Sequence, residues 1–212
     1  MNSRLLFKIL LFLLPLTAFA QTAQDWKAME RSVGVILAND LGRNGYYDQK
    51  PISETMAALC ETVDVECVVA PGDIHHFEGV RSVDDPLWMT NYELIYSHPE
   101  LMIPWHCTLG NHEYRGTTQA CIDYTRKSAR WNMPERYHTF ALTADDGTTL
   151  RFVLIDTTPL IDKYRTETSK YPDAALQDRA RLLARMASVL TAANEDWARV
   201  AGHHPVHAYT GK

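Results

Sequence analysis

Four short apolar runs, each ending at residue types that commonly bind metal ions, constrain this chain more than any other feature. The runs end at Asn39-Asp40, at Gly72-Asp73 with His75 and His76 beyond, at Gly110-Asn111-His112-Glu113, and at Gly202-His203-His204. Polar residues after one strand are ordinary turn chemistry, but four such ends in one domain are harder to attribute to turns. In open α/β sheets, sites form where loops converge at the carboxyl ends of strands. We therefore expect these residues to meet.

The first half of the chain alternates apolar runs with a helical pattern. The β-branched stretch at residues 32–40 predicts a buried strand followed by a loop. Pro51 opens a predicted helix that continues to about Thr62. The expected apolar face of this helix consists of Ile52, Met56, Ala57 and Leu59. Two further short strands are predicted within residues 66–73 and 102–113.

The second half predicts a hairpin, a helix and a last strand. Residues 137–143 and 149–158 flank Asp145-Asp146-Gly147, which is a good hairpin turn signal. Ala174 to Leu190 predicts a helix, and residues 197–205 predict a strand. The apolar residues of that helix are Leu176, Leu182, Leu183, Met186 and Leu190. Strands that alternate with helices predict an α/β domain with a partly parallel sheet.

The composition is that of one ordinary globular domain. The 212 residues are 46% hydrophobic and 22% charged, and they contain no repeat, low-complexity tract or linker. The formal net charge is −5, so the chain lacks the basic surface that nucleic acids or anionic lipids attract. We therefore expect no nucleic-acid partner.

The first twenty residues predict a cleaved secretory signal. Arg4 and Lys8 precede a short apolar run, and Ala18-Phe19-Ala20 supplies the small residues of a cleavage site. The apolar run is too short for a confident membrane span, and no cysteine stands at the cleavage point to carry a lipid anchor. We expect a signal peptide at residues 1–20, a mature domain at residues 21–212, and a secreted or periplasmic protein without a membrane anchor.

Several other residues have ordinary structural interpretations. An exported protein permits disulfides, and free thiols or one bridge are expected for Cys60, Cys67, Cys107 and Cys121. These cysteines form no CxxC pair, so a zinc site of thiolates is not expected. Trp105, Trp131 and Trp197 are expected in the core, and Asp156 is expected to be structural. Glu113 and Arg115 are interpreted as loop charges that face water.

The mixture of donor types indicates which ions such a site would hold. Carboxylates, an amide oxygen and imidazoles suit Fe, Zn or Mn, whereas calcium would require more oxygen ligands and no histidine. A carboxylate such as Asp73 can bridge two ions about 3.5–4 Å apart, the arrangement used to hydrolyse phosphate esters. The sequence therefore points to a two-metal centre.

At this point the motifs resemble a known family. Gly72-Asp73, Gly110 to Glu113 and Ala201 to Pro205 resemble the calcineurin-like metallophosphoesterases, and more narrowly the small purple acid phosphatases of the tartrate-resistant type. The similarity extends to "WNMPERY" and "LIDTTPL" and covers nearly all of the mature chain. It implies a metallophosphoesterase β-sandwich with flanking helices, built from βαβ units and mixed sheets.

The resemblance also implies a role for each site residue. Asp40 would bind the first metal, Asp73 would bridge both, and Asn111 and His203 would bind the second metal. His112 would face the substrate and assist the departure of the leaving oxygen. His204 would contact substrate or solvent.

One departure from the family lies in the second motif. Where these phosphatases have GDxxY with an iron-binding tyrosine, this chain has His76. An imidazole can still bind a metal, but it cannot produce a tyrosinate-to-iron absorption band. We therefore expect two divalent ions or a mixed pair, and no purple colour. His75 is expected to support the site from behind or to lie on the surface.

A second departure lies at the end of the chain. The last family motif, GHxH, supplies one histidine to each metal, and the sequence stops at Lys212 before reaching it. We therefore expect the domain to be incomplete at its C-terminus. The expected function is hydrolysis of phosphomonoesters, small phosphorylated molecules among them, by in-line attack of a metal-bound hydroxide. A phosphodiesterase or nucleotidase on the same core, or a non-catalytic secreted binding module, are the alternatives.

Overall fold

The computed structural model describes residues 32–205 of the chain. The predicted signal peptide at residues 1–20 lies outside the described residues, as do residues 206–212. Within the described part, no helix is long and apolar enough to cross a membrane.

The first sheet has four parallel strands in the order of the chain. They are β1 (Val35–Leu37), β2 (Cys67–Pro71), β3 (Trp105–Thr108) and β4 (Trp131–Asn132). Val35 pairs with Cys67, Val68 with Trp105, and Trp105 with Trp131. Parallel pairing places the carboxyl ends of β1, β2 and β3 at one edge of the sheet, where the first three polar motifs follow them.

The second sheet is mixed. The strands β5 (Tyr137–Thr143) and β6 (Thr149–Ile155) form the predicted antiparallel hairpin, and β7 (Trp197–Ala201) pairs with β6 in parallel. The parallel pairing matters for the site, because β7 then ends on the same side as β6. The fourth polar motif follows β7.

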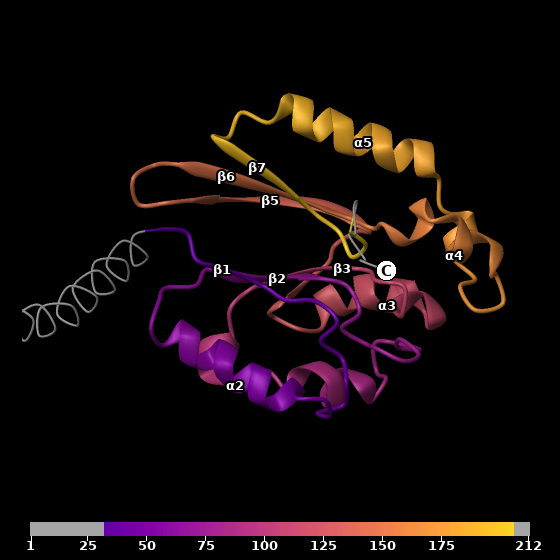
Figure 1. The fold of residues 1–212 in the computed structure, drawn as a ribbon, viewed down its shortest axis with the longest axis horizontal. Helices are drawn as coiled ribbons and strands as arrows, with labels where there is room; N and C mark the ends of the chain where they lie inside the picture. The colour runs from indigo at the N-terminus through magenta and orange to yellow at the C-terminus, as the bar shows by residue number, and fades with distance from the viewer. Residues whose placement is uncertain (1–31, 206–212) are drawn as a thin grey trace, which may run out of the picture.

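The two sheets stack face to face with helices outside them (Figure 1). Helix α5 (Arg179–Ala192) covers the outer face of the mixed sheet, and α2 (Gln49–Cys60) and α3 (Thr118–Asp123) lie on the far side of the parallel sheet. Cys67 and Val69 of β2 meet Phe152 and Leu154 of β6 between the sheets. This arrangement confirms the expected β-sandwich with flanking helices.

The remaining helical segments are short. These are α4 (Asp162–Thr166) and the single turns Met89–Glu93, Pro99–Leu101, Glu113–Arg115, Tyr124–Arg126, Thr158–Leu160 and Ala174–Leu176. The core beneath the parallel sheet is rich in aromatic rings. Trp88 stacks on Tyr124 with a centroid separation of 3.5 Å, and Trp131 packs edge-on against Trp88 at 4.9 Å.

Helix α2 buries only part of the face that was expected: Met56 and Ala57 are buried, but Ile52 and Leu59 are not. It runs from Gln49 to Cys60, and Ile52 and Leu59 are 45% and 38% exposed. Its buried face includes two polar residues, and both are satisfied there. Gln49 Nε2 donates to the carbonyl of Asn91 (2.9 Å), and Ser53 Oγ donates to the carbonyl of Ile95 (2.8 Å). Paired polar groups can be buried at low cost, so the periodicity of apolar residues alone could not predict that Gln49 and Ser53 complete this face.

The helix expected at residues 174–190 is interrupted. Ala174–Leu176 forms a single turn, and α5 begins only at Arg179. Asp178 has extended backbone angles, and its carboxylate accepts a hydrogen bond from the N–H of Arg181 (3.0 Å). Aspartate is a preferred N-cap, so it starts a new helix at this point. Leu176, now outside the helix, is 78% exposed.

The predicted core tryptophans divide between the core and the surface. Trp105 and Trp131 are buried as expected, but Trp197 is 54% exposed, because it lies on β7 at the edge of the mixed sheet. All four cysteines are free thiols, and three of them are buried. Asp156 is fully buried and receives a hydrogen bond from the Tyr114 hydroxyl, which confirms a structural role.

Asp85 stabilises the loop that follows the second motif. Its carboxylate accepts hydrogen bonds from the N–H of Arg81 (3.0 Å), the N–H of Leu87 (3.0 Å) and Nε of Arg81 (2.8 Å). Burial alone would raise the pKa of Asp85, but these bonds lower it to about 2.

We predict that Asp85→Asn destabilises the protein more at neutral pH than at low pH. The pKa is lower in the folded state than its ordinary value of 3.8, so the stabilisation is complete above that value and is lost as the pH falls toward 2. The loss at pH 7 should be about 1 kcal/mol, because the Arg81 side chain is exposed and water screens the pair. Urea unfolding from pH 7 down to pH 3 measures it. A difference that does not shrink on acidification would contradict this role.

Candidate metal centre

The four polar motifs meet at one edge of the sandwich. Asp40 follows β1, Asp73 and His76 follow β2, His112 follows β3, and His203 follows β7. Two backbone hydrogen bonds join the loops after β1 and β2. The N–H of Asp40 donates to the carbonyl of Gly72 (3.2 Å), and the N–H of Gly42 donates to the backbone carbonyl of Asp73 (3.2 Å). The expected convergence of the strand ends is therefore present in the structure.

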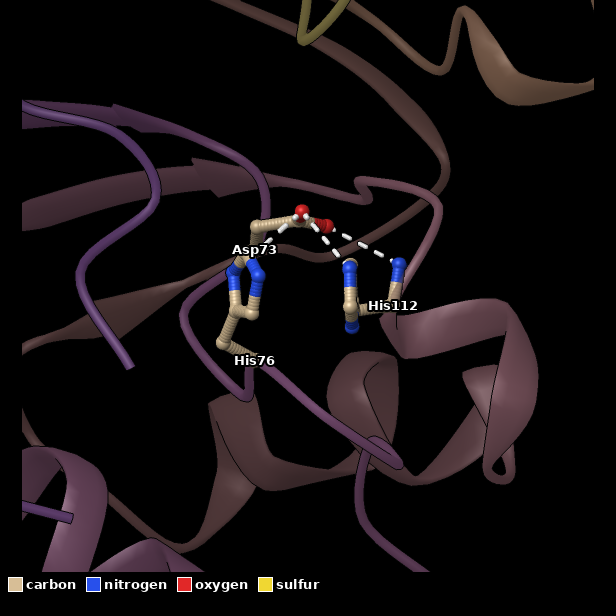
Figure 2. Close-up of side chains that lie close together, drawn as sticks. All are labelled: Asp73, His76 and His112. Carbon is tan, nitrogen blue, oxygen red and sulfur yellow. Dashed lines mark hydrogen bonds and ion pairs between the residues drawn. The ribbon is translucent and has the colours of Figure 1, made fainter. Parts of the chain in front are cut away.

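The carboxylate of Asp73 lies at the middle of this group. Its Oδ2 is 3.6 Å from His76 Nδ1, 3.7 Å from His112 Nε2 and 3.4 Å from His203 Nε2. Its Oδ1 accepts a hydrogen bond from the N–H of His112 (2.9 Å). Figure 2 shows His76 and His112 both beside the Asp73 carboxylate. The side chain of Asp73 is 2% exposed.

Two groups of potential metal ligands share Asp73. One consists of Asp73, His76 and His112, and the other of Asp40, Asp73 and His203, with all donor atoms of a group within 4.8 Å of one another. A carboxylate common to two donor groups is the geometry required of a bridging ligand. The assignment of each residue to one metal stays a prediction, as does metal binding by Asn111, which is half-buried on the same loop as His112.

Backbone carbonyls orient two of the imidazoles. His203 Nδ1 lies 3.0 Å from the carbonyl of Pro71, and His112 Nδ1 lies 3.0 Å from the carbonyl of Phe77. A carbonyl oxygen only accepts hydrogen bonds, so each Nδ1 carries a proton. In the neutral imidazole this leaves the lone pair on Nε2, the atom nearer Asp73. Metal-binding histidines are commonly oriented in this way.

The donor set fits a metal pair. Nδ1 of His76 is buried and has no hydrogen-bond partner among the described residues, although it lies near both Asp40 and Asp73. Burial and the charge of His112 lower the pKa of His76 to about 4, so its imidazole is neutral and able to bind a cation. A buried, unpaired nitrogen facing two carboxylates is costly unless it binds an ion.

The charges of the centre are strongly linked. Burial alone would raise the pKa of Asp73, but contact with His203 and the N–H of His112 lowers it below its usual range. Burial alone would lower the pKa of His203, yet the carboxylates of Asp73 and Asp40 raise it to about 9. The carboxylates thus create a negative potential that attracts a cation.

The chain matches known proteins along its length. The sequence pattern of the calcineurin-like phosphoesterases matches residues 35–212. The chain belongs to the calcineurin-like phosphoesterase family. Purple acid phosphatase 4 of Arabidopsis thaliana is 29% identical over 93% of this chain and 59% of its own length. Tartrate-resistant acid phosphatase type 5 of Sus scrofa is 30% identical over 73% of this chain and 46% of its own length.

This member of the family spans about half the length of those curated relatives. Among solved structures, it resembles GAP50, described as the anchor in the inner membrane complex of Plasmodium. The TM-score is 0.68 at 20% identity, covering 84% of this chain and 56% of that one. At this identity the likeness concerns the fold.

His75 and His204 each stand next to a histidine of the two ligand groups, and the structure gives the surroundings of both. His75 lies in the interior, fully buried, and its ring packs edge-on against Trp88 at 4.3 Å. Of the two expected places for His75, the surface is thus excluded, while support of the site from behind stays a prediction. His204 holds both ring nitrogens near hydroxyl groups, Thr157 Oγ1 at 2.9 Å and Tyr164 at 3.2 Å. Substrate contact by His204 stays a prediction.

Glu113 was expected to face water, and that interpretation was wrong. It is 2% exposed. Its Oε2 accepts hydrogen bonds from the N–H groups of Asp73 (2.9 Å) and Gly110 (2.8 Å), and its Oε1 accepts from the N–H of His75 (2.9 Å). One buried carboxylate thus joins the second and third motif loops. Its position directly after Asn111-His112 was the only signal in the sequence.

The two loops also require glycine where they touch. A Cβ added to Gly110 would lie 2.2 Å from Oδ1 of Asp73, and one added to Gly72 would lie 2.5 Å from the N–H nitrogen of Gly110. Gly72 has a φ of +95°, which further disfavours any side chain there. The absence of side chains lets the loops approach until Glu113 can bind both.

We predict that Glu113→Gln destabilises the protein and weakens metal binding. Glutamine has one acceptor oxygen, so its amide group would face a backbone N–H that loses its partner. The cost of such an unpaired buried group is about 1–3 kcal/mol. Thermal unfolding of the metal-free protein measures the stability, and calorimetric titration with Zn²⁺ or Mn²⁺ measures the affinity. Glu54→Gln, exposed on helix α2, serves as the control, and equal behaviour of the two variants would refute the role of Glu113.

Proposed function

We propose that this protein hydrolyses phosphomonoesters at a centre of two metal ions. The supporting observation is the shared position of Asp73, whose buried carboxylate belongs to both groups of potential ligands. The family and its purple acid phosphatase relatives support the same type of reaction. Asp40, Asp73, His76, Asn111 and His203 would hold the ions, which the donor chemistry suggests are Fe, Zn or Mn.

The bound ions would lower the pKa of water and offset the negative charge of the phosphate. The residues of the chain contribute position and charge. Asp73 belongs to both donor groups, and Glu113 accepts hydrogen bonds from the N–H groups of Asp73 and His75 in the same loop. His112 is fixed by the carbonyl of Phe77 with Nε2 beside the donor set. From this place it can contact a phosphoryl oxygen or the leaving oxygen.

The replacement of the family tyrosine by His76 bears on the choice of metal. An imidazole brings no negative charge, so it favours a trivalent ion less than a tyrosinate does. We therefore propose a divalent or mixed pair. Export of the protein is a further part of the proposal, and it rests on the leader-like pattern of the first twenty residues.

We predict that the full-length, metal-loaded protein hydrolyses phenyl phosphate. His112→Ala should lower kcat by about 10²–10⁴, the usual range for loss of a general acid. Asp73→Asn should abolish activity together with metal binding. His98→Ala, a half-exposed histidine paired with Glu61, is the matched control and should change neither.

The same assay separates the alternatives. Faster hydrolysis of bis(4-nitrophenyl) phosphate than of 4-nitrophenyl phosphate would favour a phosphodiesterase. A folded protein that binds two ions but cleaves neither substrate would favour a non-catalytic binding module. An unchanged rate in His112→Ala would remove the proposed role of that residue while leaving the metal centre in place.

A further inference from the structure

Two arginines contact Phe77 beside the metal centre, Arg43 at its ring and Arg115 at its carbonyl. We call Arg43, Phe77 and Arg115 the arginine rim. The Phe77 ring is 42% exposed and lies 5.8 Å from the ring of His76, which in turn stacks on His112 at 3.8 Å. The rim therefore continues directly from the ligand group that contains His76 and His112.

Arg43 is held in place by two aromatic rings. Its guanidinium lies 5.6 Å from the ring centroid of Phe77 and 5.7 Å from that of Tyr47. Its backbone N–H donates to Oε1 of the buried Gln49 (3.0 Å), which also binds the N–H of Gly45 (2.7 Å). These contacts fix the loop that carries Arg43, so little freedom remains to be lost when the guanidinium binds an anion.

Arg115 contacts the backbone of the same residue, Phe77. Its Nη1 donates to the carbonyl of Phe77 (2.8 Å), the carbonyl that also orients His112. Its guanidinium lies 5.8 Å from the ring of Tyr171. Its Nε is buried and has no hydrogen-bond partner among residues 32–205. Arg115 thus retains donors that nothing in the described part of the chain satisfies.

Neither rim arginine forms an ion pair with a carboxylate of the described residues. Other arginines of the fold do: Arg130 pairs with Glu93, Arg136 with Asp156, and Arg151 with Glu195. Unpaired guanidinium groups are suited to binding phosphate, because they offer several donors in a planar arrangement. Two of them next to a phosphate-hydrolysing centre form a second place for an anion.

We propose that the arginine rim binds a second phosphate group of the substrate, so that the protein prefers small bisphosphorylated molecules to simple monoesters. This inference rests on the proposed function, since it places the first phosphate at the metal centre. The second phosphate would lie across Phe77, with the connecting part of the leaving group over its exposed ring. Arg43 and Arg115 are then specificity-determining residues.

The kinetic test compares phenyl phosphate with benzene-1,4-diyl bisphosphate, using the full-length, metal-loaded protein. After correction for its two equivalent phosphates, the bisphosphate should have a kcat/KM about tenfold higher, as expected for one charge-assisted contact. In Arg43→Met and in Arg115→Met this ratio should fall toward one. The control is Arg199→Met, since Arg199 also lies over an aromatic ring, that of Trp197, but on the edge strand β7. It should leave the ratio unchanged.

A binding test does not depend on turnover. Calorimetry would compare butylphosphonate with butane-1,4-diylbisphosphonate, neither of which can be hydrolysed. Preference for the bisphosphonate that disappears in Arg43→Met but persists in Arg199→Met supports the rim. Suppose that phenyl phosphate is hydrolysed, but that the kcat/KM ratio of the two esters and the affinity ratio of the two phosphonates are the same in every variant as in the unchanged protein. The rim proposal then fails, and the proposed function stands. If neither ester is hydrolysed, the proposed function fails, and equal binding of the two phosphonates would then overturn the rim as well.

Discussion

The buried carboxylate of Asp73 is the group on which the site and the surrounding loops depend. Its Oδ2 lies within 3.4–3.7 Å of three imidazole nitrogens that come from three different loops. This buried charge is stabilised by His203 and by the N–H of His112, which donates to Oδ1. The same desolvation that makes the carboxylate costly without a partner makes it a strong ligand for cations.

The sandwich is what brings the last of these imidazoles to the carboxylate. His203 belongs to the mixed sheet, and Asp73 to the parallel one. A Cβ added to Gly72 would lie 3.0 Å from the Cβ of His203, so glycine at residue 72 lets the loops of the two sheets come this close. Contacts of Val69 with Phe152 and Leu154 set the distance between the sheets. Packing far from the centre thus determines the geometry within it.

The convergence of the four motif loops could be predicted from the sequence, because each apolar run stops at residue types that bind metals. Asp40, Asp73, His76 and His203, which the structure brings together as potential ligands, were among the predicted residues. What could not be predicted depends on three-dimensional partners. Glu113 and Gln49 are polar residues whose burial depends on N–H and carbonyl groups far away in the chain. His75 and His76 are identical in type, and only the packing of His75 against Trp88 separates their roles. The exposure of Trp197 follows from the place of β7 in its sheet.

Location of the bound ions tests the central claim most directly. Crystals of the full-length protein loaded with Mn²⁺ or Zn²⁺ would be measured by anomalous diffraction at the absorption edge of the metal. The account predicts two anomalous peaks about 3.5–4 Å apart, each within ligand distance of an Asp73 oxygen. A single peak, or two ions bound where Asp73 does not lie between them, would contradict it.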